Sequence, residues 1–414
     1  MFTDPTSIRG FGKVGRLEFY EAAGNRFAIF INTNTNEKDI ANRAAEVFQQ
    51  NPDTIDTVLV LVRLDAQVPT FQYLVIERDG SWSEMCGNGA RAVAKYLYDS
   101  GLVKPDEPII LVTKSGKQVI VQSVKKNGET WYQVNMGRVT SVTEDPNSFS
   151  KVLQVNYDGN LEQLQLVRYL KEPKENQLGQ LVLSELSSYL RNPEYLEELF
   201  PDLLPNNQPN PLAVYRSQFL NIFSTVIKED EFTTKFAPTL RYRGLYQAGG
   251  EPHTLIEITD PEIVNILGED RLSDYLKAVS FVLRHLRDKE GRRLYPQSMN
   301  FMFYTVQPTP DGTTDTQGQG VEVKMYPAER GVHNGPNYDQ TGACGTGSCC
   351  LGNYLLKHLK HDPRFANLLL KHLKHDPRFT NEITIFNRSG IPLIVSLDEE
   401  GNTQLIGQAE RTNR

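Results

Sequence analysis

Cysteine is scarce in this chain, and long apolar runs are missing. The spacing of its few thiols does not form the disulfide framework of a secreted protein. No apolar run approaches the roughly 18 residues that a membrane-spanning helix needs. The first residues lack the basic-then-apolar order of a signal peptide. We therefore expect a cytoplasmic protein whose thiols are reduced. The four cysteines are Cys86, Cys344, Cys349 and Cys350.

An excess of basic residues is also lacking, since 44 Lys and Arg face 51 Asp and Glu, for a net charge of −7. An acidic balance argues against general binding of nucleic acid. With 39% hydrophobic and 23% charged residues, the composition is that of a globular protein. A chain of 414 residues is long for one domain and comfortable for two. We expect neither a nucleic-acid nor a membrane partner, and a homodimer is left open.

Strand-like and helix-like patterns alternate along the chain. Residues 57–64 and 70–77 are rich in β-branched and aromatic residues and predict strands. From Ala90, apolar residues at helical spacing lead to a Gly, a common helix end, and three strands with Gly-containing turns follow. Strands at 253–258 and beyond, with a helix at 272–287, repeat this order. The pattern predicts an α/β (α+β) fold.

The region 145–240 differs from its surroundings. It joins an acidic amphipathic stretch to a Pro- and Asn-rich loop, and we interpret it as an insertion that forms surface or a lid. The expected organisation is therefore an N-terminal domain at 1–144, the insertion, and a C-terminal domain at 241–414.

A short segment occurs twice near the C-terminus. "LLKHLKHDPRFAN" (355–367) returns as "LLKHLKHDPRFTN" (369–381) with one difference. The copies contain four of the seven His, and His at i and i+3 share a helix face that could bind a metal. A tandem duplication of a surface segment explains the copies without a metal, so we expect no metal site. The four residues are His358, His361, His372 and His375.

Two cysteines stand in matching contexts. "CGNG" at Cys86 and "CGTG" at Cys344 each lie between a strand pattern and a helix pattern, 258 residues apart. Tyr-Leu follows at the same spacing in both helices, at Tyr96 and Tyr354. This weak internal repeat predicts two similar halves that face each other.

The chemistry of such a pair is specific. A helix N-terminus carries unpaired N–H groups and a partial positive charge, so it binds carboxylates and lowers the pKa of a thiol. Glycines let a ligand approach the backbone. Two such helix starts could hold one carboxylate with a thiol on each side, one removing a proton and the other returning one. This arrangement predicts racemisation without a cofactor.

Other interpretations of the thiols are weaker. A lone Cys is often a small buried hydrophobe, which is how we interpret Cys349 and Cys350. A structural disulfide between Cys86 and Cys344 conflicts with a reducing compartment. A Cys-only metal site lacks the usual Cys-x-x-Cys spacing.

These motifs resemble those of a known family. "DGSWSEMCGNGAR" (79–91) and "ERG…ACGTGS" (329–348) are similar to the two signatures of diaminopimelate epimerases. "AAGNRF" (22–27), "GGEPHTLIEI" (249–258) and "YPQSMNFMFYTV" (295–306) resemble further motifs of that family, and so does "LIGQAE" near the end. The resemblance covers most of residues 15–140 and 245–410. It implies two pseudo-symmetric domains, each a mixed β-sheet wrapped around a central helix.

The resemblance also implies roles for single residues. Cys86 and Cys344 would be the paired acid and base, and Arg330 would face the far carboxylate of a diaminopimelate. Glu329 would bind the α-amino group, and Asn25 would help to position the substrate. The N–H groups that would hold the α-carboxylate are those of Gly87, Asn88, Gly345 and Thr346.

Three positions depart from the family. Where it has Asn at the distal end of the substrate, this chain has Glu77, Glu251 and Ser298. Two carboxylates favour a cationic group over a second carboxylate, although Arg330 could pair with one of them. The loop that contains His333 is also longer than in the family.

The sequence therefore predicts a pyridoxal-independent epimerase or racemase of an α-amino acid. LL-diaminopimelate, converted to the meso form for lysine and cell-wall biosynthesis, is the default substrate by resemblance. A basic amino acid such as lysine, ornithine, arginine or histidine is the rival. A non-catalytic binding or assembly protein and a lyase are alternatives from other classes, and retention of both thiols argues against them.

Overall fold

The structure is a computed structural model. The residues that it describes are 16–33, 35–51, 54–65, 67–78, 80–141, 177–192, 216–285, 299–308, 321–328, 341–358 and 382–412.

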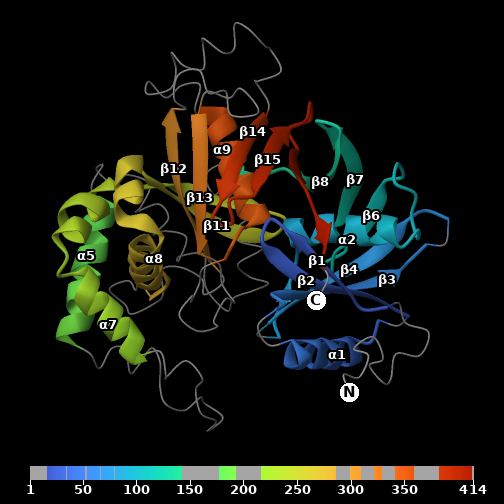
Figure 1. Cartoon of the computed structure of the whole chain (residues 1–414), viewed down its shortest axis with the longest axis horizontal. Helices are drawn as coiled ribbons and strands as arrows, with labels where there is room; N and C mark the ends of the chain where they lie inside the picture. The colour runs from blue at the N-terminus through green and yellow to red at the C-terminus, as the bar shows by residue number, and fades with distance from the viewer. Residues whose placement is uncertain are drawn as a thin grey trace, which may run out of the picture.

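The first half of the chain forms a sheet around one helix (Figure 1). Its central helix, α2 (Gly87–Asp99), contacts β1, β2, β7 and β8. A second helix, α1 (Glu37–Gln50), lies against β3 on the other face of the sheet. The strands are β1 (Glu18–Ala22), β2 (Asn25–Asn32), β3 (Thr57–Arg63), β4 (Thr70–Glu77), β5 (Trp82–Ser83), β6 (Ile109–Val112), β7 (Gln118–Lys126) and β8 (Glu129–Gly137).

The second half repeats this arrangement around helix α9 (Gly345–His358), which contacts β10, β11, β14, β15 and β16. Helix α8 (Pro261–His285) corresponds to α1 and contacts β12 and β13. The strands are β10 (Leu240–Ala248), β11 (Glu251–Ile258), β12 (Asn300–Pro308), β13 (Val321–Ala328), β14 (Glu382–Asn387), β15 (Pro392–Leu397) and β16 (Thr403–Gly407).

Strand pairing is the same in both halves. β2 pairs in parallel with β3, β3 antiparallel with β4, β4 in parallel with β6, and β6, β7 and β8 continue antiparallel. The series β11, β12, β13, β14, β15 and β16 has the same order of parallel and antiparallel pairs. β8 then pairs antiparallel with β16, its own counterpart, and this joins the halves into one sheet, with 17 strands among the described residues.

Each half also lends a short strand to the other. β9 (Thr140–Ser141) follows β8 but pairs with β10. β17 (Glu410–Arg411) follows β16 but pairs with β1. The two exchanges are equivalent, so pseudo-twofold symmetry governs the whole sheet.

The internal repeat predicted from sequence is visible in the side chains. The ring of Tyr20 on β1 meets that of Tyr96 on α2 edge-on, with centroids 5.9 Å apart. Tyr246 on β10 meets Tyr354 on α9 in the same way, also at 5.9 Å. The predicted fold class, two pseudo-symmetric halves with a central helix each, is thus confirmed.

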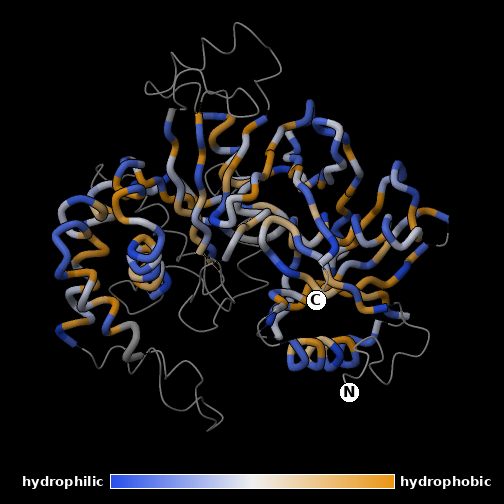
Figure 2. The backbone as a smooth tube through the Cα atoms, in the orientation of Figure 1, coloured by the Kyte–Doolittle hydropathy of each residue, from blue (hydrophilic) through white to orange (hydrophobic). Residues whose placement is uncertain are grey.

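Apolar residues form three main layers. One core surrounds α2 and α9 and draws residues from both halves. A smaller core lies between α1 and β2–β4, where Ile40, Ala44 and Val47 form the buried stripe of α1. Helix α1 contains both hydrophilic and hydrophobic residues (Figure 2), and its buried residues recur at helical spacing, as burial of one face requires. The third core lies between β10–β13 and the helices on the left of Figure 1.

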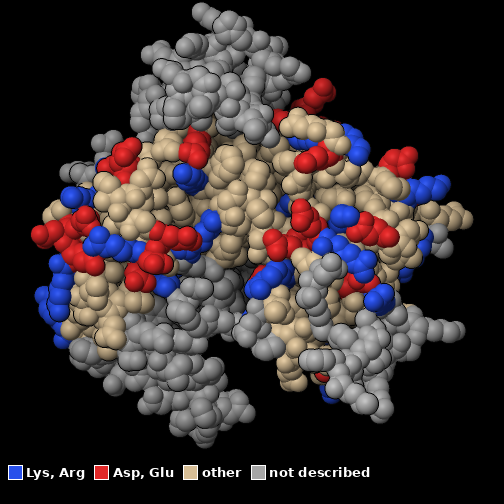
Figure 3. Space-filling model, viewed as in Figure 1, with Lys and Arg blue, Asp and Glu red and all other residues tan. Residues whose placement is uncertain are grey.

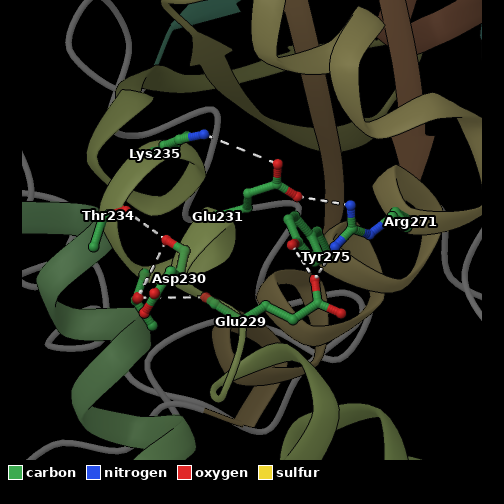
Figure 4. A network of polar contacts seen from close by, with 8 residues as sticks. Glu229, Asp230, Glu231, Thr234, Lys235, Arg271 and Tyr275 are labelled. Carbon is green, nitrogen blue, oxygen red and sulfur yellow. Dashed lines mark hydrogen bonds and ion pairs between the residues drawn. The ribbon is translucent and has the colours of Figure 1, made fainter.

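That third core contains the described part of the region predicted as an insertion. Helices α5 (Gln177–Arg191) and α7 (Arg216–Val226) pack against α8, and the π-helical turn η3 (Glu231–Phe236) leads through η4 (Ala237–Thr239) into β10. Arg271 on α8 binds Glu229 at 3.1 Å and Glu231 at 2.7 Å, and Tyr275 donates to Glu229 (Figure 4). These bonds tie η3 to α8. The boundaries at 144 and 240 stay a prediction.

Several elements were not predicted. Helix α8 begins at Pro261, not at 272, and bends at Gly268, whose φ of 68° is non-helical. Gly, Glu and Asp at 268–270 interrupt the apolar periodicity, so the sequence pattern does not reveal the first turns of α8. Strands β1, β2 and β10 and helix α1 were also missed.

Charge is mixed over the face shown in Figure 3, where acidic and basic side chains of the described residues lie close together in both halves. The described residues include ion pairs with exposed side chains, such as Lys114 with Glu37 at 2.9 Å. Among the described residues, no helix is both long and apolar enough to cross a membrane.

The fit of α9 against its sheet generates a prediction. A Cβ at Gly352 would lie 2.5 Å from Cβ of Val395 on β15. We expect Gly352→Ala to lower the free energy of unfolding by about 1–3 kcal/mol, because overpacking a close contact strains the core. Chemical denaturation measures this. Lys357→Ala, at an exposed position of the same helix, should change it by less than about 0.5 kcal/mol, and equal effects would contradict the close contact.

Candidate active site

Cys86 caps the N-terminus of α2. Its Sγ accepts a hydrogen bond from the backbone N–H of Gly89 at 3.3 Å, and its backbone is extended (φ −125°). The Cys86 carbonyl accepts the hydroxyl of Tyr73 at 2.9 Å. A thiol at this position meets the positive end of the helix dipole, which favours its thiolate form.

Cys344 stands at the corresponding place before α9. Its Sγ accepts the N–H of Gly347 at 3.0 Å, and its own N–H donates to Oδ1 of Asn387 at 3.3 Å. Cys344 is 2% exposed, whereas Cys86 is partly exposed. The two thiols therefore share one local geometry but not one environment.

The first turns of the two helices touch. A Cβ at Gly345 would lie 2.8 Å from Oδ1 and 3.0 Å from the backbone N of Asn88, so only glycine fits there. Nδ2 of Asn88 in turn donates to the carbonyl of Ala343 at 3.4 Å. Leu405 on β16 lies against both Gly87 and Gly345. The N–H groups of the first helical residues, which have no intrahelical acceptor, thus gather at one junction.

The hairpin turns of each half reach the helix start of the other. The β1–β2 turn lies against Gly342 and Ser389 of the second half. Its Asn25 accepts from Asn88 at 3.0 Å and donates to Thr341 at 3.3 Å. Conversely, the β10–β11 turn at Gly249 lies against Met85. The junction is therefore enclosed by both halves.

A histidine that the sequence analysis did not single out lies beside Cys344. Nε2 of His253 on β11 is 3.5 Å from Sγ of Cys344 and 3.1 Å from Oγ1 of Thr346, and the side chain is fully buried. Strand register places His253 where the first half has Phe27. The motif "GGEPHTLIEI" contains this residue, but the sequence alone does not show that it lies beside Cys344.

Glu77 ends β4, opposite Thr57 on β3. Its carboxylate accepts the hydroxyls of Thr57 at 3.0 Å and Ser83 at 2.7 Å. These bonds hold the Glu77 side chain in one orientation near Tyr73. The hydroxyl of Tyr73 in turn donates to the carbonyl of Cys86.

The structure thus brings together seven of the predicted residues. Glu77 is described above, and the remaining predicted residues lie wholly or partly outside the described part of the chain. The backbone of Glu251 begins β11, and its side chain lies outside the described part. Ser298, Glu329, Arg330 and His333 lie outside the described residues, as does all of the duplicated segment after His358. The seven residues are Asn25, Cys86, Gly87, Asn88, Cys344, Gly345 and Thr346.

Thiol reactivity should separate the cysteines. Burial raises the pKa of Cys349 and of Cys350 well above the usual value, so both stay protonated through mildly alkaline pH. We expect native protein at mildly alkaline pH to be alkylated by iodoacetamide at Cys86 first and not at Cys349 or Cys350, as read by peptide mass spectrometry. Denatured protein is the control and should react at all four. Equal labelling of Cys349 in the native state would contradict its burial.

Part of the chain is similar in sequence to known proteins. Residues 19–142 match the family model for diaminopimelate epimerase. The diaminopimelate epimerase of Nitratiruptor sp. is 28% identical over 167 residues, which are 35% of this chain and 66% of that protein. The enzyme of that name from Thermotoga maritima is 33% identical over 102 residues, which are 25% of this chain and 41% of that protein. The chain therefore matches no more than 66% of the length of these two relatives.

A solved structure supports the fold over the full length. The phenazine biosynthesis protein of the PhzF family from Bacillus anthracis superposes with a TM-score of 0.51 at 11% identity and covers 97% of this chain and 98% of its own. At this identity the likeness concerns the fold alone. The sequence matches show that residues 19–142 are similar to the diaminopimelate epimerase family.

Proposed function

We propose that this protein is a pyridoxal-independent epimerase or racemase that inverts the α-carbon of an amino acid with Cys86 and Cys344 as acid and base. The observation that carries this proposal is the pairing of two equivalent thiol-capped helix starts in direct contact, Gly345 against Asn88. The family and the relatives support the same class of reaction.

The α-carboxylate of the substrate binds at the junction of α2 and α9. There the first-turn N–H groups and both helix dipoles favour an anion. The α-carbon then lies between the sulfurs, one of which removes its proton as thiolate while the other donates a proton to the opposite face. The thiolate and thiol exchange roles in one turnover, so a proton must pass back between them before the same direction can run again.

The two thiols differ in the groups that surround them. Cys344 has the imidazole of His253 in reach, which can take up or return its proton, and the hydroxyl of Thr346, which can donate a hydrogen bond to the thiolate. Cys86 has the N–H of Gly89 and is partly exposed. On this proposal, His253 adjusts the protonation of Cys344 in the resting enzyme.

The substrate is an α-amino acid with a functional group at its far end. LL-diaminopimelate is the first candidate, because the relatives carry that name. A basic amino acid is the second, because Glu77 is an anchored carboxylate at the end of β4, where it would attract a distal ammonium or guanidinium group.

Proton exchange tests the reaction. Under reducing conditions in deuterated water, we expect the protein to incorporate deuterium at the α-carbon of its substrate and to invert it, as read by NMR and chiral chromatography. The amino acids to be tested are LL-diaminopimelate, lysine, ornithine, arginine and histidine. Cys86→Ala and Cys344→Ala should each reduce inversion by at least about 1,000-fold, because each removes a reacting group.

The control for these variants is Cys350→Ala, which removes a buried thiol outside the pair. It should keep inversion within a few-fold of the native protein. Full inversion by either Cys86→Ala or Cys344→Ala would end the two-thiol mechanism, whatever the substrate.

Glu77 decides between the two substrate classes. If the distal group is cationic, Glu77→Asn should raise KM by about tenfold or more, since a lost charge contact of about 1.4 kcal/mol has that effect. Ser83→Ala removes one bond that orients Glu77 and leaves the charge, so it should change KM by less. For diaminopimelate, Glu77→Asn should instead lower KM. No change with any substrate would place Glu77 outside the site.

A further inference from the structure

Arg91 is a buried charge at the junction of the two helices. It lies one turn into α2, has no exposed surface, and is among the largest fully buried side chains. Burial lowers its pKa to about 10, so it is still protonated at neutral pH. Within the described parts of the chain, no carboxylate forms an ion pair with it.

Its guanidinium fixes the orientation of Asn88. One NH2 group donates to Oδ1 of Asn88 and the other to the carbonyl of Gln408, both at 2.6 Å. Because Oδ1 is engaged by Arg91, the amide Nδ2 of Asn88 faces Asn25 and Ala343. Arg91 thus sets the bonds by which the two helix starts are joined.

The site around Arg91 is shaped for a guanidinium. A Cβ at Gly407 would lie 2.2 Å from its Nη1, so glycine there makes the room. The equivalent position in α9, 258 residues later, is Cys349. Its side chain is small, and its sulfur lies within electrostatic range of the Arg91 guanidinium. Nε of Arg91 is buried and has no hydrogen-bond partner among the residues that the structure describes.

Thiols are the titratable groups that influence Arg91. They are Cys86 at the N-terminal cap of α2 and Cys349 on α9. Tyr73, on β4, lies within electrostatic range of Cys86. On the other strands that pack against α2, Tyr20 and Tyr132 lie toward its far end, near Asp99.

A buried charge without a counter-charge costs stability, and apolar replacements of such groups are often neutral or stabilising. An anion that arrives at the junction would offset this cost. We propose that Arg91 is a positioning residue of the site, which orients Asn88 and supplies the positive charge that stabilises the anion at the helix junction, whether thiolate or bound carboxylate. This inference rests on the proposed function for the carboxylate, but its effect on Cys86 does not need a substrate.

The test compares Arg91→Met with Arg91→Lys. In both, we would measure the rate of iodoacetamide reaction at Cys86 against pH, the thermal midpoint, and kcat/KM for the substrate found by proton exchange. Cys349→Ala is the matched control, because it removes the thiol at the equivalent position of α9 without changing the charge.

Arg91→Met should raise the apparent pKa of Cys86 alkylation by about one unit, lower kcat/KM by about 100-fold, and leave the thermal midpoint unchanged or higher. Arg91→Lys should keep the alkylation pKa near that of the native protein and still lower kcat/KM, because one ammonium nitrogen does not replace the two separate NH2 groups that hold Asn88 and Gln408. Cys349→Ala should leave the alkylation pKa unchanged.

An unchanged alkylation pKa in Arg91→Met, with a lower thermal midpoint, would overturn the inference and assign Arg91 a structural role. If Arg91→Met does not fold, a raised alkylation pKa in Arg91→Lys would overturn it as well. Were no amino acid to exchange its α-proton while the alkylation pKa still shifted, the charge effect on Cys86 would stand and the proposed function would fail.

Discussion

The contact between the N-termini of α2 and α9 is the constraint on which the rest of the structure depends. Gly345 packs on Asn88 with no room for a Cβ, and the carbonyl before Cys344 accepts from the Asn88 amide. Two positive helix ends repel each other, so this contact needs support. The β8–β16 pairing and the exchange of β9 and β17 supply it by joining the halves along one sheet.

Symmetry builds the frame, and departures from symmetry give the site its chemistry. Equivalent strand positions hold Phe27 in one half and His253 in the other, so within the described residues His253 places an imidazole beside Cys344 and its counterpart places a phenyl ring in the other half. Arg91 and Cys349 occupy equivalent helix positions 258 residues apart. One large cation and one small side chain fit across the axis, where two arginines would repel and crowd each other.

Sequence reasoning predicted the frame better than the environment of each thiol. The repeated Cys-Gly-x-Gly and the later Tyr-Leu pair predicted two halves with a central helix each, because local patterns record local structure. His253 and Arg91 could not be assigned in this way. Their neighbours, Cys344 and Gln408, are distant in sequence, and strand register and the helix contact bring them together. The missed start of α8 shows the same limit, since its bend at Gly268 interrupts the apolar period.

The unequal thiols are compatible with the proposed inversion. In either direction one sulfur takes a proton and the other gives one, so both must cycle between thiol and thiolate. A permanent thiolate at either position would block one direction. Arg91 and the helix dipole favour the anion near Cys86, while the His253 imidazole gives Cys344 a partner with which to exchange its proton. Two different means of stabilising the same ionised state therefore allow a symmetric reaction on an asymmetric pair.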